Sequence, residues 1–203
     1  MSRRHFTSDW HLGMQVLLDK NVMGNDVRKF ENVNQMNQAI ITAANMQCPK
    51  DDIIIHVGDL YYFDSKNGEK PIDLLKFINA QLINIHGNHD SNNKVKSICH
   101  SMRTVLGKKY TAVSVSHYPT YDKRAYGQFI EGDIHICGHV HGKWKHCLDL
   151  DNRCLNINVG IDVWNLKMPT DDDLIKYIDK LLELPKNKLN IVTKKKDIQN
   201  EQK

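Results

Sequence analysis

The segment LINIHGNHD, residues 82–90, joins a short apolar run to a polar cluster that begins at a glycine. Such a run, ended by Gly87, predicts a buried strand. Polar motifs follow predicted strands at four other places: SDWH at 8–11, GD at 58–59, SH at 116–117 and GHVHG at 138–142. Ligands of open α/β sheets bind outside the carboxyl ends of the strands. We therefore expect the five motifs to line one site.

The rest of the chain alternates strands with helices and then runs through several strands. Strands are predicted over residues 4–8, 52–57, 82–85, 111–116, 133–137 and 155–159. Helices are predicted over residues 32–47, from Pro71 to Ile78, and over residues 171–184 behind a Thr170 cap. This order favours an α/β sandwich over an all-helical or all-β domain.

Charge separates the body of the chain from its end. Of 203 residues, 28 are Lys or Arg and 24 are Asp or Glu, which gives a net charge of +4. Six of those lysines and two of those acids lie beyond Leu184, so residues 1–184 carry 22 of each sign. The composition predicts one domain over residues 1–184 and a basic, mobile tail over residues 185–203. A neutral body disfavours a nucleic acid polymer as the partner.

The five cysteines form no CxxC pair, which indicates free thiols in a reducing compartment. No run of about 18 apolar residues predicts a membrane span. The opening MSRRHFTSDWHLG has no apolar stretch typical of a secretory signal. These features together predict a cytoplasmic protein that does not contact the membrane.

Two motifs carry donors two residues apart, Asp9 with His11 and His139 with His141. On an extended backbone such pairs face the same side, so each pair can point into one cavity. Imidazole nitrogens and carboxylate or amide oxygens without thiolate favour Mn, Fe, Ni or Zn. The donors outnumber the needs of one ion, which indicates two divalent ions about 3.5–4 Å apart.

Taken singly, these residues have simpler interpretations. Asp9 or Asp59 alone is more often a turn or cap residue, and His117 alone is more often a packed core histidine. Histidines inside predicted strands, at 56, 86 and 135, are expected to be packed, and those at 5, 100 and 146 to lie at the surface. The complete set of motifs in this order outweighs the single interpretations.

In that order the motifs resemble the calcineurin-like metallophosphoesterases, and residues 155–164, LNINVGIDVW, resemble the sheet-closing region of compact bacterial and phage-type members. The resemblance implies a four-layer α/β/β/α sandwich. It implies a first metal held by Asp9, His11 and His141, a bridging Asp59, and a second metal held by Asn88, His117 and His139. It also implies that His89 is the catalytic histidine, which donates a hydrogen bond or proton to the leaving group and is held in orientation by Asp90.

The resemblance and the residues together predict a binuclear-metal phosphoric ester hydrolase that works by attack of a hydroxide bound to two metals. We expect two divalent ions, Mn²⁺ in vitro with Fe, Ni or Zn as alternatives, and a small nucleotide-like phosphodiester in preference to a phosphomonoester. Aromatic side chains near the motifs could stack on a base: Tyr61, Tyr62, Phe63, Tyr118 and Trp144. Two alternatives stay open, a nuclease on single-stranded nucleic acid and a non-catalytic scaffold on the same fold.

Overall fold

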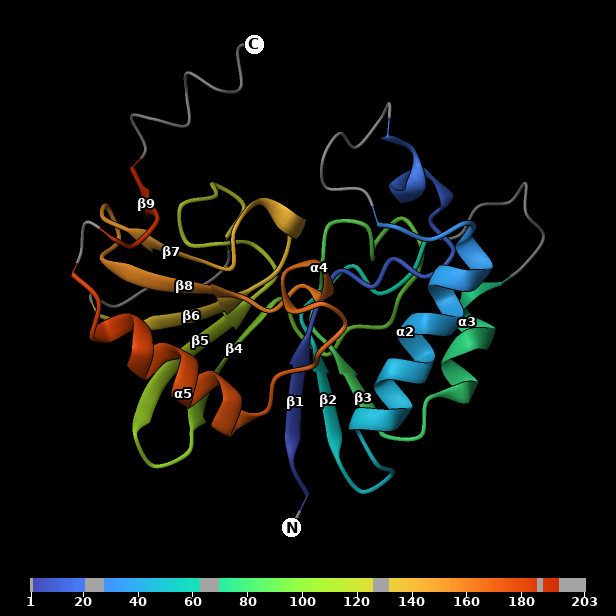
Figure 1. The fold of residues 1–203 in the computed structure, drawn as a ribbon, viewed down its shortest axis with the longest axis horizontal. Helices are drawn as coiled ribbons and strands as arrows, with labels where there is room; N and C mark the ends of the chain where they lie inside the picture. The colour runs from blue at the N-terminus through green and yellow to red at the C-terminus, as the bar shows by residue number, and fades with distance from the viewer. Residues whose placement is uncertain (1, 21–27, 63–69, 126–131, 186–187, 194–203) are drawn as a thin grey trace.

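The computed structural model describes residues 2–20, 28–62, 70–125, 132–185 and 188–193 (Figure 1). Its strands are β1 Arg4–Thr7, β2 Ile53–His56, β3 Gln81–Asn84, β4 Ser101–Leu106, β5 Tyr110–Ser116, β6 Ile134–Cys137, β7 His146–Asp149, β8 Cys154–Asn158 and β9 Ile191–Val192. The α-helices are α2 Val33–Gln47, α3 Pro71–Leu74, α4 Ile161–Trp164 and α5 Asp171–Leu182, and the 3₁₀ helices are η1 Gln15–Leu18, η3 Leu75–Phe77 and η4 His141–Lys143.

The first sheet is parallel, in the order β1-β2-β3, and α2 and α3 cover its outer face (Figure 1). Helix α2 begins where the Asn32 side chain accepts the backbone N–H of Gln35 at 2.9 Å, a regular N-cap. Its apolar positions Met36 and Ile40 pack with Ile54 of β2 in one buried cluster. Because side chains alternate along a strand, one face of β2 packs against the helices and the other against the second sheet.

The second sheet is mixed, in the order β4-β5-β6-β8-β7-β9. A second buried cluster joins the two sheets and includes Phe6 of β1, Ile136 of β6 and Ile157 of β8. Leu174 and Ile178 of α5 belong to the same cluster, and α5 runs across the second sheet in Figure 1. Two sheets flanked by helices confirm the predicted α/β sandwich.

Several boundaries differ from the sequence prediction. Strands β4 and β7 were not predicted, because each is short and mixes polar with apolar residues, without an apolar run or a regular alternation of burial in β4 and with a buried Asp149 in β7. The helix predicted from Pro71 to Ile78 is one turn of α3 followed by η3. His5 is also not at the surface: it is 3% exposed, and its Nε2 lies 2.9 Å from an Asp52 carboxylate oxygen.

Part of the predicted tail, residues 185–203, pairs with the second sheet. Residues 190–192 add β9 to the second sheet, where Leu148 N donates to Asn190 O at 2.7 Å. Leu189 packs against the core cluster between the sheets. Apolar residues at 189, 191 and 192 make this pairing possible, and the lysine-rich composition concealed them. Residues 186–187 and 194–203 lie outside the described residues.

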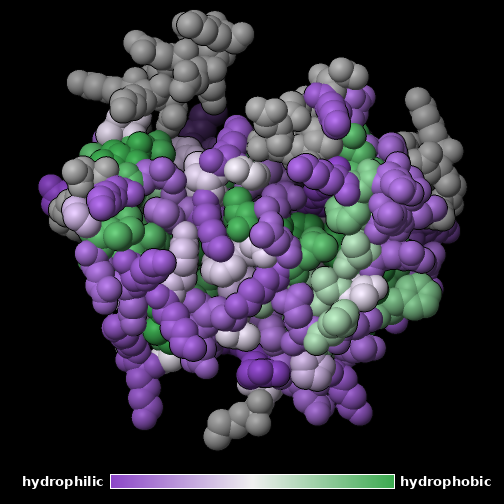
Figure 2. All heavy atoms as spheres, viewed as in Figure 1, coloured by the Kyte–Doolittle hydropathy of each residue, from purple (hydrophilic) through white to green (hydrophobic). Residues whose placement is uncertain are grey.

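The surface in Figure 2 is mostly hydrophilic, with hydrophobic side chains over α2 and α3 and also over the second sheet. Met46 of α2 and Phe77 of η3 are exposed. None of the helices in the described ranges is long and apolar enough to cross a bilayer.

Candidate metal centre

Hydrogen bonds tie together the loops that follow β1, β2, β5 and β6, and Gly138 N donates to His117 O at 3.0 Å between the last two. Asp9 N donates to Gly58 O and His11 N to Asp59 O, both at 3.0 Å. Across the two sheets, His139 N lies 3.1 Å from both carboxylate oxygens of Asp9. The motifs therefore meet at the carboxyl ends of the strands, as the sequence predicted.

The backbone of the donors is left-handed rather than extended. Positive φ angles occur at Asp9 (58°), His11 (47°), Asp59 (61°), His139 (71°) and His141 (47°). Only four other non-glycine residues in the described ranges share this conformation. Each such residue costs on the order of 1–3 kcal/mol, and this kind of strain clusters at functional sites. The expectation of extended i, i+2 pairs was therefore wrong in its geometry, because β1 and β6 end before the donors.

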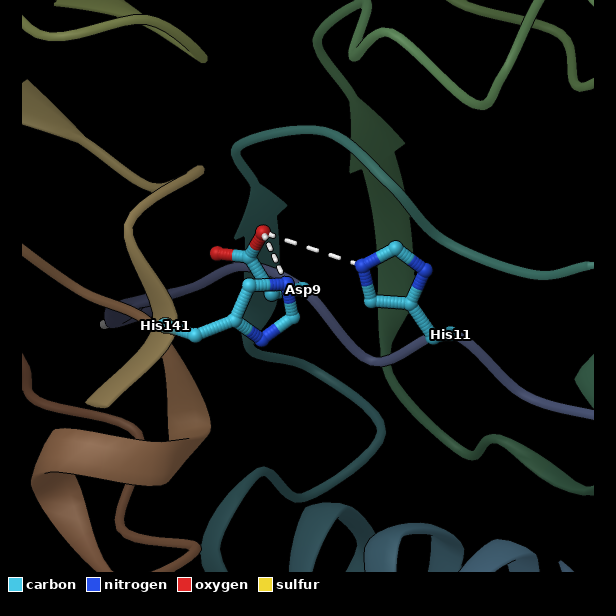
Figure 3. Close-up of side chains that lie close together, drawn as sticks. All are labelled: Asp9, His11 and His141. Carbon is cyan, nitrogen blue, oxygen red and sulfur yellow. Dashed lines mark ion pairs between the residues drawn. The ribbon is translucent and has the colours of Figure 1, made fainter. Parts of the chain in front are cut away.

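A first donor group contains Asp9, His11 and His141, whose ligand atoms lie within 4.8 Å of one another. The two histidines approach the Asp9 carboxylate from different chain segments (Figure 3). Nε2 of each histidine lies 3.9 Å from Oδ1 of Asp9. The structure thus gathers all three residues that the resemblance assigned to the first metal.

His11 shows most clearly that this donor group suits a metal ion. Its side chain is 1% exposed, and neither ring nitrogen has a hydrogen-bond partner in the described part of the chain. Burial lowers the pKa of His11 well below its ordinary value, despite the opposing effect of Asp59, so the ring is neutral. A neutral buried imidazole without partners is costly on its own but suits a metal ion at one nitrogen. The donor set therefore fits a divalent metal.

His141 has a partner on the far side of its ring. Its Nδ1–H donates to Oδ2 of Asp162 at 2.9 Å, which leaves Nε2 directed at Asp9. Burial alone would lower the pKa of His141, but Asp162 and Asp9 raise it overall. A carboxylate behind a histidine is the usual way to fix the ring and strengthen it as a metal ligand.

Arg28 connects this carboxylate to the loop that carries Asp9. Its Nε donates to Oδ1 of Asp162 at 2.8 Å, and its Nη1 donates to Trp10 O at 2.7 Å. Its Nη2 donates to the backbone carbonyl of Asp9. Neither Arg28 nor Asp162 was singled out from the sequence. Asp162 could have been found, because it follows a predicted strand and a glycine as the other motif residues do.

A second donor group contains Asp9, Asp59 and His117, and Asn88 adjoins it. Nε2 of His117 lies 3.3 Å from Oδ2 of Asp59 and 3.0 Å from Oδ1 of Asn88. The opposite nitrogen of the ring, Nδ1, donates to Val57 O at 2.8 Å. Because Oδ2 of Asp59 is also 3.5 Å from Nε2 of His11, Asp59 lies between the two groups. That place suits the bridging role, which stays a prediction.

In this second group, the Asp59 carboxylate and the His117 ring shift each other's pKa. Burial would lower the pKa of His117, but the facing Asp59 carboxylate outweighs it and raises the pKa to about 9. The same contact, with His11 nearby, holds the pKa of Asp59 far below its usual range despite burial. A metal ion that binds Nε2 of His117 must therefore displace a proton.

His139 differs from the other predicted ligands. Its ring lies beside His117, with centroids 5.2 Å apart, but its Nε2 accepts a hydrogen bond from Nη2 of Arg124 at 2.9 Å. Asp122 lies behind this contact, with Oδ2 3.8 Å from the same nitrogen. His139 therefore borders the second group without joining it in this structure.

His89 and Asp90 have different surroundings. The His89 ring lies 5.1 Å from the His11 ring, and its backbone N–H donates to Oδ1 of Asp59 at 2.8 Å. The Asp90 carboxylate accepts N–H groups from the backbone of Gly87, Asp59 and Leu60 and from the Asn84 side chain. In the described residues it holds these loops and not the His89 ring, so the predicted orientation of His89 by Asp90 is indirect.

Glycine is required where these loops touch. A Cβ at Gly87 would lie 2.3 Å from Oδ1 of Asp59, and one at Gly138 would lie 2.3 Å from Oγ of Ser8. Neither neighbour can retreat, since Ser8 Oγ donates to Asp9 Oδ2 at 2.5 Å and Asp59 faces the histidines. The glycines of the motifs therefore permit close contact between the donor loops.

The aromatic side chains expected near the site divide into three cases. Tyr61 is buried among the residues under α2, so it packs in the core. Tyr62 lies 6.2 Å from the His89 ring, and Tyr118 lies 4.8 Å from the His139 ring. The rings of Trp144 and Tyr121 have centroids 6.3 Å apart. Phe63 lies outside the described residues.

Comparison with known protein families identifies the superfamily of this chain. Residues 6–168 match the calcineurin-like phosphoesterase superfamily domain. The chain belongs to that superfamily. An uncharacterised protein of Methanocaldococcus jannaschii is 29% identical over 158 residues, which span 75% of this chain and 81% of that protein.

A protein of unknown function from Aquifex aeolicus has a similar fold in its crystal structure, with a TM-score of 0.60 at 19% identity. The match covers 89% of this chain and all of the other, and at this identity it supports the fold alone. Superfamily membership identifies a hydrolase of phosphoesters that depends on divalent metal ions. The two Asp/His groups are its candidate metal-binding residues.

Proposed function

We propose that this chain hydrolyses a small phosphodiester with two divalent ions at the two donor groups. Asp9, His11 and His141 hold the first ion, Asn88, His117 and His139 hold the second, and Asp59 is shared. The observation that carries the proposal is His11, wholly buried between Asp9 and Asp59 with neither ring nitrogen partnered in the described chain. Together with His117 and His141, His11 places three histidine rings around the carboxylates of Asp9 and Asp59.

When bound, such ions lower the pKa of a water molecule and neutralise charge on the phosphoryl oxygens. The chain contributes position and protons. His89 lies at the edge of both groups and can donate a hydrogen bond or proton to the leaving group. Its backbone is anchored on Asp59, and the adjacent Asp90 carboxylate fixes the loops of both motifs.

The substrate we propose is nucleotide-like and small. The body of the chain, residues 1–184, has no net charge, whereas contacts to many phosphates require clustered Lys and Arg. Tyr62 places an aromatic ring beside His89, where a base could stack. A phosphodiester is favoured over a phosphomonoester, and single-stranded nucleic acid is the competing substrate.

The ion we expect in vitro is Mn²⁺, because imidazole ligands bind Mg²⁺ poorly and the donors include no thiolate. Fe, Ni or Zn would suit the same donors. The cellular location we propose is the cytoplasm, since the five cysteines, all within the described residues, form no disulfide.

Turnover of a substrate panel tests the proposal. Chelator-treated protein would be supplied with Mn²⁺ or Mg²⁺ and assayed on phosphomonoesters, cyclic nucleotides, dinucleotides and single-stranded DNA at two salt concentrations. We expect Mn²⁺ to restore hydrolysis better than Mg²⁺ and the small diesters to have the highest kcat/KM. A preference for DNA that collapses as salt rises would favour the nuclease. No hydrolysis of any substrate would favour a scaffold.

A further inference from the structure

His56 and Asn84 end the two neighbouring strands that lead into the donor loops. They are the last residues of β2 and β3, and they are paired in the parallel register of the first sheet. Both side chains are buried. The loop that carries Asp59 follows His56, and the loop that carries Asn88 follows Asn84. The two side chains therefore lie where both loops begin.

The amide of Asn84 has one orientation that satisfies all of its neighbours. Its Nδ2 donates to Oδ2 of Asp90 and to Oγ of Ser97, both at 3.0 Å. Its Oδ1 therefore faces His56, whose Nδ1 lies 2.8 Å away and carries the proton. The imidazole thus sets the direction of the amide, and the amide directs its donors to Asp90.

The imidazole of His56 lowers stability at its other nitrogen. With the proton on Nδ1, Nε2 is an acceptor, and this atom is buried without a hydrogen-bond partner in the part of the chain that the structure describes. The Trp10 ring packs edge-on to the imidazole, with centroids 5.0 Å apart. A leucine at position 56 would leave no such acceptor. What the imidazole supplies and a leucine would not is the donor for the Asn84 amide.

The Asp90 carboxylate connects this pair to both donor loops. Its Oδ2 accepts the backbone N–H of Gly87 at 2.8 Å and that of Asp59 at 3.2 Å. The Asn84 amide donates to the same oxygen. Because these donors belong to the end of β3 and to the two loops, the orientation of the carboxylate sets the spacing between Asp59 and Asn88.

We propose that Asn84 and His56 are positioning residues for the second ion. His56 fixes the Asn84 amide, and the amide holds the Asp90 carboxylate in the orientation that sets the distance from Asp59 to Asn88. The proposal rests on the proposed function, in which Asp59 and Asn88 both bind the second ion. Outer partners of this kind tune the affinity of a metal site without contact to the metal.

The test compares three variants with the wild-type protein. Asn84→Asp keeps the shape of the side chain but faces Asp90 with a second carboxylate. Asn84→Leu removes the amide, and His56→Phe keeps a ring without the Nδ1 donor. The matched control is His5→Phe, because His5 is also a buried histidine of the first sheet and bonds to Asp52 at the amino ends of the strands, away from the donor loops.

Two sets of quantities would be measured on full-length protein. Calorimetry of metal-free protein gives the affinities for the first and the second Mn²⁺. Steady-state kinetics on a small diester gives kcat and KM over a range of Mn²⁺ concentrations. Metal binding does not depend on turnover, so it separates this proposal from the proposed function.

We expect both Asn84 variants to bind the second ion about 10–100-fold more weakly than the wild type, with Asn84→Asp the weaker of the two. His56→Phe should lose about tenfold, because the amide stays but is no longer fixed. The first ion should bind as in the wild type. Excess Mn²⁺ should restore kcat and KM in these variants, since the chemical groups are intact. His5→Phe should keep the wild-type affinity for both ions.

Wild-type affinity for the second ion in Asn84→Leu and His56→Phe would overturn the proposal, and His56→Phe decides alone where the Asn84 variants do not fold. Equal weakening in His5→Phe, or a kcat that excess Mn²⁺ does not restore, would show a general effect on the fold and overturn it as well. A wild type that binds one ion would overturn both proposals. Two ions that bind in an Asn84-dependent way without hydrolysis of any ester would contradict the proposed function alone.

Discussion

Nδ1 of His141 and Oδ2 of Asp162 lie 2.9 Å apart, and this hydrogen bond turns the other ring nitrogen toward Asp9. His141 belongs to the second sheet's loops and Asp9 to the first sheet's. Arg28 holds the same Asp162 carboxylate and the backbone carbonyl of Asp9. The first donor group is therefore assembled across the two sheets by residues that are not themselves in the group.

Removing the Asp162 carboxylate should weaken the first metal. In Asp162→Ala, His141 loses the acceptor that fixes its tautomer, and Arg28 is left with an unpaired buried charge. We expect the affinity for one of two Mn²⁺ ions to fall by about 10–100-fold, the usual range for such partners. Metal titration by calorimetry measures this, with the exposed Asp172→Asn as the control. Equal affinity in Asp162→Ala and the wild type would show that Asp162 does not support the site.

Substitution of His89 should impair catalysis without loss of metal, whereas substitution of Asp59 should impair metal binding. His89→Ala should lower kcat by about 10²–10⁴-fold while both ions stay bound, because the ring is at the edge of the donors. Asp59→Asn should lose metal, since Asp59 lies between His11 and His117. Mass spectrometry of the two variants counts the ions. The roles would be reversed if His89→Ala lost metal and Asp59→Asn kept it.

The residue types and the order of the motifs were sufficient to predict that Asp9, His11 and His141 lie together. Strand ends, glycines and donors are local features, so the convergence of Asp9, His11 and His141 could be predicted from sequence. The partners of the donors could not, because Arg28 reaches Asp9 and Asp162 only through the tertiary fold. The contact of Arg124 with His139 likewise depends on how a loop packs.

The elements of the fold show the same division. The core strand β2 and the capped helices α2 and α5 follow from apolar periodicity and cap residues. Strand β4 is half exposed and β9 is two residues long, so neither has a period that is visible in sequence. The left-handed backbone of Asp9 and Asp59 suits aspartate, which adopts positive φ more often than most residues, but the sequence pattern does not show which aspartates adopt it.

The metal-free protein should lose stability in mild acid. Burial lowers the pKa of His56 and of His135 to about 4, against the smaller opposing effects of their neighbours. Their contribution to stability is full above the unfolded value of about 6.5 and is lost as the pH falls through 4, at roughly 3 kcal/mol each. Chemical denaturation in excess chelator measures this. In His135→Gln the free energy of unfolding should fall less steeply as the pH is lowered from 6.5 to 4. A slope equal to that of the wild type would contradict the lowered pKa of His135.

Truncation should distinguish β9 from the residues beyond it. Removal of residues 194–203 should leave the free energy of unfolding unchanged, because Ile191–Val192 stays paired with β7. Removal of residues 185–203 takes away that pairing and Leu189, which packs on the core, so it should lower stability by about 1–3 kcal/mol. Urea denaturation of both truncated proteins decides this. Equal stability of the two would show that β9 contributes nothing.

The central claim is that two divalent ions at the Asp9 and Asp59 groups drive phosphoester hydrolysis. Its most direct test is to titrate metal-free protein with Mn²⁺ and to measure bound ions and diester hydrolysis in the same samples. We predict saturation at two ions per chain, with hydrolysis appearing as the second ion binds, and neither in His11→Ala. Full hydrolysis in excess chelator, or two bound ions with no hydrolysis of any phosphoester, would contradict the claim.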